Sequence, residues 1–71
     1  MLYVLKIKGT KMIPDFVQIR DENMSLRAYF RLSQQEIGLK KNNLSEDAEG
    51  IMRLLNEIPF GKIYRYETNK I

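Results

Sequence analysis

The sequence predicts a small α+β domain in which a four-stranded, mainly antiparallel sheet carries two helices on one face. Three observations predict it. Residues 24–32 alternate between apolar and polar side chains, which is the period of a half-buried strand. Residues 48–58 instead place apolar side chains at helical spacing. Short segments typical of strands at 2–8, 16–20 and 62–67 complete the order β-β-β-α-α-β.

The length of 71 residues sets the scale of the fold. We expect a single domain over residues 1–67 and a frayed C-terminal tail over 68–71. A domain of this size buries only about 60% of the surface that its unfolded chain exposes. The chain has no Cys for a disulfide and no His or Cys for a transition-metal site. Well-formed secondary structure or oligomerisation must therefore stabilise it.

The first two strands are separated by a loop that opens at Gly9. In the first strand both rows of side chains begin apolar, and the row of Leu2 and Val4 continues into Lys6 and Lys8. We expect this basic row to face away from the helices, although the sequence leaves open whether Leu2 or its neighbour points into the core. Because Pro14 cannot donate a ladder hydrogen bond, the second strand begins after it.

The second and third strands form a hairpin through residues 21–23, where Asn and Asp tolerate positive φ. Core-facing residues of one strand must pair with core-facing residues of the other. Because odd-numbered residues point inward on the second strand and even-numbered ones on the third, the numbers of two paired residues add up to an odd value. We expect the inward pairs to be Ile19 with Leu26 and Val17 with Ala28. On the outer face the same register pairs Gln18 with Arg27 and Phe16 with Tyr29.

Both helices carry capping signals. Ser33 and Glu36 have the spacing of a capping box, which predicts a first helix over 34–41. Asn42 and Asn43 then suit a left-handed helix end. Ser45 is the expected cap of the second helix, which Pro59 stops.

After a turn at Gly61 the last strand begins, and we expect it beside the first strand and antiparallel to it. This arrangement makes the first strand an interior one, which fits its two apolar rows. Whether Tyr64 and Tyr66 face the core or the solvent stays open at this point, and the answer decides how aromatic the outer face is.

The sequence offers little chemistry for catalysis. Without His or Cys, the usual base at neutral pH and the usual thiol nucleophile are missing. The four glycines are isolated, so no Gly-rich phosphate loop exists. The acidic residues that open the second helix fit its dipole better than an acid-base pair or a Ca²⁺ loop. We expect no enzyme, no catalytic residue, no metal or other cofactor, and no small-molecule site.

Targeting signals are equally sparse. The apolar start of the chain precedes its basic residues, whereas a secretory signal has the opposite order. No stretch approaches the ~18 apolar residues of a membrane-spanning helix. We therefore expect a cytoplasmic protein that does not bind a membrane.

The sheet face away from the helices is the surface most suited to a function. Our main hypothesis is a protein interface, either in a homodimer or with another protein, because apolar surface rimmed by polar groups commonly marks such a site. Tyr and Arg often anchor these interfaces. The residues expected in it are Leu2, Val4, Phe16, Gln18, Arg27 and Tyr29.

Single-stranded nucleic acid is the alternative partner, since arginines neutralise phosphates and aromatic rings stack on unpaired bases. The residues expected to carry this binding are Lys6, Lys8, Arg20, Arg27, Tyr29 and Arg31. The Gly-rich, alternating aromatic pattern of an RNA-recognition strand is absent. A third possibility is that the face is only a solvated surface, as in many antiparallel sheets.

Overall fold

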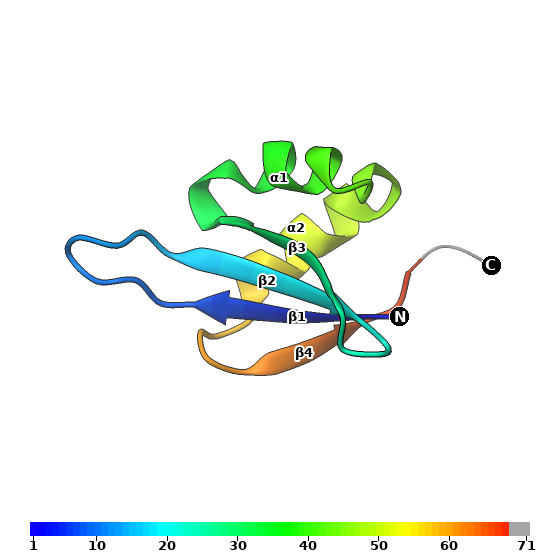
Figure 1. Cartoon of the computed structure of the whole chain (residues 1–71), viewed down its shortest axis with the longest axis horizontal. Helices are drawn as coiled ribbons and strands as arrows, with labels where there is room; N and C mark the ends of the chain where they lie inside the picture. The colour runs from blue at the N-terminus through cyan, green and yellow to red at the C-terminus, as the bar shows by residue number, and fades with distance from the viewer. Residues whose placement is uncertain (69–71) are drawn as a thin grey trace.

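The computed structural model describes residues 1–68 and has the predicted β-β-β-α-α-β order (Figure 1). Apart from Thr68, the predicted tail lies outside the described residues. Two short 3₁₀ turns, η1 (Leu32–Gln34) and η2 (Ser45–Asp47), precede the helices. The main elements are β1 (Leu2–Ile7), β2 (Phe16–Asp21), β3 (Leu26–Arg31), α1 (Gln35–Lys41), α2 (Ala48–Glu57) and β4 (Ile63–Tyr66).

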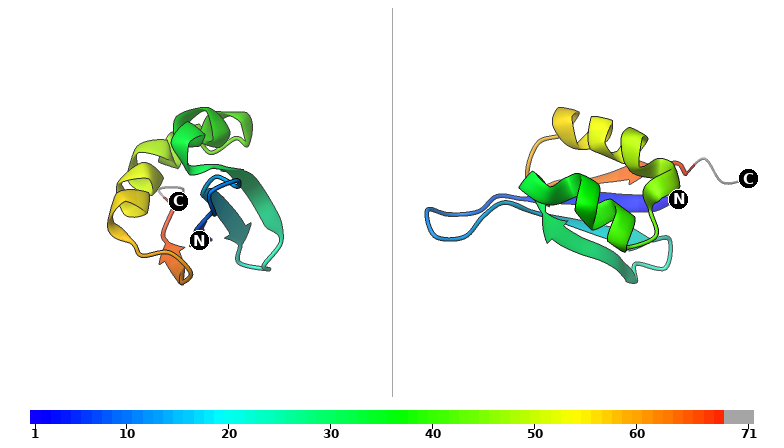
Figure 2. Two further views of the ribbon diagram at one scale, coloured as in Figure 1. Left: turned by 90° about the vertical axis from the view of Figure 1, so that its left-hand side faces the viewer. Right: turned by 90° about the horizontal axis from the view of Figure 1, so that it is seen from above.

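The four strands form one antiparallel sheet in the order β3-β2-β1-β4, so the predicted place of the last strand beside β1 is confirmed. Both helices lie over the same face of this sheet (Figure 2). Val4 and Ile19, which are paired on β1 and β2, are fully buried with Leu39 of α1 and Ile51 of α2. The core therefore fills the space between the sheet and the two helices.

The orientation predicted for β1 is wrong. Leu2, Val4 and Lys6 are the buried residues of this strand and face the helices. The reason lies in the cross-strand pairs, because Val4 sits opposite inward Ile19 on β2 and opposite Tyr64 on β4. Lys6 can lie on this face because its ammonium group donates a buried hydrogen bond to the Leu55 carbonyl oxygen.

From Phe16 to Ile19 the β2–β3 hairpin keeps the predicted odd sum of paired residue numbers, but the pairing is shifted by two residues along β3. Ile19 pairs with Ala28, and a bulge then brings Leu26 opposite Arg20. Met24 in the turn adopts a positive φ of 64°. Leu26 was expected to point inward, but the bulge leaves it 52% exposed on the outer side of the sheet.

Neither predicted serine cap forms. The chain enters α1 through η1 and α2 through η2, and no side-chain hydrogen bond caps either α-helix. The helix end at Asn42 and Asn43 is as predicted: Asn43 has a φ of 61°, and Asn42 Nδ2 donates to the Gly38 carbonyl oxygen at 2.7 Å.

Two glycines allow close packing of the helices on the sheet. A Cβ atom at Gly38 would collide with the Phe30 ring on β3, and one at Gly50 would collide with the Tyr66 hydroxyl. Tyr66 and Tyr64 pack against the core, so they face the helices. Burial raises the pKa of Tyr66 above 10.0, and Asp47 raises it further by its charge and by accepting a hydrogen bond.

Candidate functional site

The face of the sheet opposite the helices is the candidate site, and we call it the open face. Outward positions follow from the strand registers, which place Tyr3 between Arg20 and Arg65, and Leu5 between Gln18 and Ile63. Together the outward residues are Tyr3, Leu5, Ile7, Phe16, Gln18, Arg20, Leu26, Tyr29, Arg31, Ile63 and Arg65. Seven of these eleven side chains are apolar or aromatic.

An aromatic stack lies on the open face. The rings of Phe16 and Tyr29 are 4.7 Å apart between centroids and inclined by 14°. In the observed register Phe16 pairs with Arg31 and Tyr29 pairs with Gln18, so the two rings meet diagonally across the ladder. The predicted contact between the rings is thus present, although the predicted direct pairing is not.

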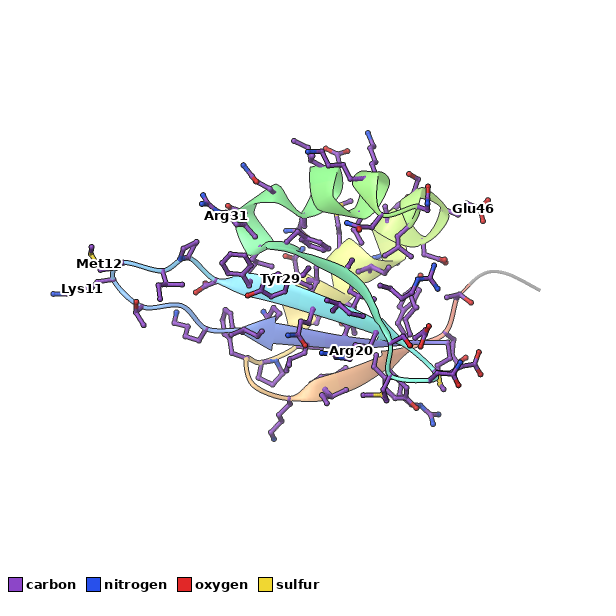
Figure 3. All side chains as sticks on the ribbon, in the orientation of Figure 1. Lys11, Met12, Arg20, Tyr29, Arg31 and Glu46 are labelled. Atoms are coloured by element: carbon purple, nitrogen blue, oxygen red, sulfur yellow. The ribbon has the colours of Figure 1, made fainter. Side chains whose placement is uncertain are left out.

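The charges of the open face all have the same sign. The outward positions of the four described strands hold three arginines and no carboxylate. Arg20 Nη1 donates to the Met24 carbonyl oxygen at 2.9 Å, which holds this side chain near the hairpin turn. In Figure 3 Arg20 and Tyr29 lie over the sheet, whereas Arg31 extends at the end of β3 beside the start of α1.

Three of the predicted protein-interface residues, Phe16, Gln18 and Tyr29, lie on the open face. Leu2 and Val4 are buried on the opposite face and do not contribute. Arg27 is the extra residue of the bulge, and it lines a hollow at the end of the sheet together with carboxylates. The acidic residues of this hollow are Asp21, Glu22, Glu46 and Asp47.

Lys6 and Lys8, which we predicted to contact nucleic acid, lie near the end of α2. Lys6 is only 8% exposed, and its Nζ donates to the Leu55 carbonyl oxygen at 2.8 Å. The same nitrogen lies 4.5 Å from the centre of the Phe60 ring, and Lys8 Nζ lies 5.0 Å from it. Of the predicted nucleic-acid set, Arg20, Tyr29 and Arg31 are on the open face.

Sequence reasoning missed most of the apolar residues on the open face. Tyr3, Leu5 and Ile7 form the outward row of β1, and Ile63 extends the surface onto β4. A usable signal was the alternation of Ile63 and Arg65 with the two tyrosines of β4. Burying the tyrosine row and placing β4 beside β1 would have brought Ile63 next to Leu5.

The loop between β1 and β2 extends well beyond the sheet, and Lys11 and Met12 lie at its tip (Figure 3). Met12 is 91% exposed. Internal hydrogen bonds shape the loop: the amides of Met12 and Ile13 donate to Thr10 Oγ1, and the Gly9 amide donates to Asp15 Oδ1 at 2.7 Å. The tip is therefore a hydrogen-bonded turn that exposes Met12 beside Lys11.

Residues 1–68 hold neither a metal centre nor a membrane-spanning helix. This part of the chain contains no group of three or more His, Cys, Asp or Glu side chains arranged to hold a metal ion. Its helices are too short and too polar to cross a bilayer. Comparison of the chain with protein-family models, with curated proteins and with solved structures gives no match.

Proposed function

We propose that this protein is a non-enzymatic interaction module that binds protein through its open face, most simply a second copy of itself. The observation that carries the proposal is the composition of that face: seven apolar or aromatic side chains, three arginines and no carboxylate at the outward strand positions. Apolar surface of this kind is typical of association sites. A cytoplasmic location stays a prediction from the sequence.

The dimensions of the face suggest how strong such binding is. Four strands spaced by ~4.8 Å and six residues rising by ~3.3 Å each give a projected area of roughly 400 Å². Two such faces in contact give about 800 Å², which is below the 1,200–2,000 Å² that stable specific interfaces bury and in the range of weak, transient ones. We therefore expect weak, reversible association in the micromolar range.

Arginine is compatible with an interface between two copies. Its planar guanidinium stacks on aromatic rings, and Tyr3, Phe16 and Tyr29 supply three rings on the same face as the arginines. Two packed sheets are rotated relative to each other, by about 30° or about 90°. Arginines of one copy placed over rings of the other would offset the repulsion between the two sets of arginines.

A matched pair of isoleucines tests this proposal. Ile63 on the open face is 57% exposed, and Ile37 on α1 is 56% exposed. We expect Ile63→Glu to abolish self-association, while Ile37→Glu leaves it unchanged. Sedimentation equilibrium from about 5 to 500 µM covers the affinity expected for an interface of this size. A wild-type mass of 8.4 kDa throughout this range would refute self-association.

A second variant, Tyr29→Glu, places a charge in the aromatic stack and should also give a monomer. Thermal unfolding of every variant shows whether the fold is kept. If the wild-type protein dimerises and neither Ile63→Glu nor Tyr29→Glu weakens the dimer, association uses another surface and the proposal is wrong.

Single-stranded nucleic acid is a second candidate partner because the exposed Tyr29 ring lies on the same face as Arg20 and Arg31. Such binding should weaken steeply with salt. Arg31→Ala should reduce it in a titration with a fluorescent single-stranded RNA at low salt. Absence of binding at low salt would dispose of this candidate.

A further inference from the structure

The outer edge of β3 carries backbone groups that are not paired with a neighbouring strand of the described chain. Among residues 1–68, β3 is an outer strand paired only with β2, so half of its backbone hydrogen-bonding groups face away from the sheet. The bulge lies near the start of the strand, between the pairs Ile19–Ala28 and Arg20–Leu26. Residues 28–31 beyond it keep regular pairing with β2 and therefore present a regular free edge.

A groove runs beside this edge, between β3 and α1. Phe30 and Gly38 are among the residues that line it, and the close packing of Gly38 on the Phe30 ring explains why the helix lies so near the strand. Ile37, which is more than half exposed, and Tyr29 add apolar surface. An extended segment paired with β3 would direct alternate side chains toward this groove.

The charges around the groove are basic. Arg31 and Lys41 line it, and neither takes part in the salt bridges of the described chain, which join Lys40 to Glu36 and Arg53 to Glu49. β3 itself carries arginines and no carboxylate. An acidic segment would therefore find two cations without an ion-pair partner among residues 1–68.

A second copy of this chain is a poor occupant of the same edge. Two β3 strands paired with each other would place one arginine-bearing strand directly against another. The other outer strand, β4, carries Arg65 and has Lys62 just before it, so it offers no better match. Like charges facing each other across a ladder are destabilising.

We propose that β3 accepts an extended, acidic segment of another protein as a fifth strand, with apolar side chains of that segment in the groove and its carboxylates near Arg31 and Lys41. This binding mode uses backbone pairing for affinity and the groove for specificity. It shares Tyr29 and Arg31 with the open face, but it also depends on the outer edge of β3 and on α1, which the open-face proposal does not use.

The probe for this proposal is a short fluorescein-labelled peptide of alternating glutamate and valine, titrated with the intact protein by fluorescence anisotropy. We expect saturable binding that weakens with salt. Arg31→Glu and Lys41→Glu should each weaken binding about three- to tenfold, as expected for exposed charges at an interface. Lys62→Glu is the matched control for Lys41→Glu and should leave binding within about twofold of the wild type.

Backbone pairing is tested on the peptide, so the fold of the protein is not disturbed. The same probe with every residue N-methylated keeps its side chains but loses the amide donors of both its edges, and it should not bind. Amide hydrogen exchange should slow in β3 when the unmodified probe is present. Equal binding of the N-methylated probe, protection confined to β4, or no saturation at millimolar probe would each overturn the proposal.

Association through the open face and strand addition at β3 can be refuted independently of each other. The monomeric variant Ile63→Glu should bind the acidic probe as the wild type does, because Ile63 lies on β4 at the opposite side of the sheet. Loss of probe binding in this variant would show that the peptide occupies the open face, which would refute strand addition at β3.

Discussion

Replacement of Lys6 by methionine tests whether the buried ammonium group stabilises the fold. Lys6 Nζ donates to the Leu55 carbonyl oxygen at 2.8 Å, and this carbonyl belongs to the last turn of α2, whose acceptors have no partner within the helix. The Phe60 ring covers the same nitrogen at 4.5 Å. Methionine keeps most of the apolar stem of the side chain but removes the donor and the charge.

The expected cost can be worked from these contacts. A hydrogen bond from a charged donor contributes about 1.5–3 kcal/mol, and a partly buried cation over an aromatic ring adds about 0.5–1 kcal/mol. Methionine avoids the cost of dehydrating an ammonium group, which offsets part of this loss. We expect Lys6→Met to lower the free energy of unfolding by about 2 kcal/mol, a large share of the roughly 4–10 kcal/mol typical of a domain this size.

Urea unfolding measures this change, and Lys8→Met is the matched control. Lys8 lies near the same ring but is exposed, so its replacement should cost less than about 0.5 kcal/mol. With an m value of about 1 kcal/mol/M, Lys6→Met should lower the urea midpoint by about 2 M. A midpoint equal to or above that of the wild type would show that the buried lysine does not stabilise the fold.

Substitutions at three further positions test the packing, a helix end and a buried tyrosine. Gly38→Ala should destabilise the protein by about 1–2 kcal/mol in urea unfolding, because the clash with the Phe30 ring outweighs a gain of about 1 kcal/mol in helix propensity; a more stable variant would contradict the close packing. Asn43→Ala should cost about 1 kcal/mol and Asn43→Gly much less, because Asn43 has a positive φ; equal costs would argue against the left-handed helix end. Because the fold raises the pKa of Tyr66, its protonated form stabilises the folded state fully below pH 10 and less as the pH rises through the raised value. Wild-type stability should therefore fall relative to Tyr66→Phe in unfolding experiments above pH 10, and parallel pH profiles would refute this.

The order of elements and the place of β4 were predictable because they depend on patterns that few arrangements satisfy. The alternation of Val17 and Ile19 and the helical stripe through Ile51 and Leu55 each bury one set of side chains. An antiparallel β4 beside β1 then follows from the short connections of the chain.

The hairpin register and the helix starts were less predictable, because both depend on local geometry that competes with the sequence signal. A positive φ at Met24 and a bulge before Ala28 turn Leu26 outward. Similarly, Ser33 and Ser45 lie in 3₁₀ turns, where their side chains do not cap the α-helices that follow. A side-chain cap stabilises a helix start by only about 1 kcal/mol. Packing of the preceding strand and loop easily outweighs a contribution of this size.

The orientation of β1 decides how the candidate site is understood. Lys6 suggested that its row faced solvent, yet a long lysine side chain can follow an apolar path to a distant acceptor. In the observed orientation of β1, the open face carries Tyr3, Leu5 and Ile7 instead of the predicted Leu2, Val4, Lys6 and Lys8.

The exchange makes that face more apolar and removes cations that a nucleic acid would need. Lys6 and Lys8 lie beside Phe60, and Arg27 lies among carboxylates, so three of the five basic residues expected to contact phosphate are unavailable on the open face. Arg65 on β4 replaces only one of them. Because phosphate neutralisation scales with the number of contacting cations, whereas protein association scales with apolar burial, the observed orientation favours a protein partner.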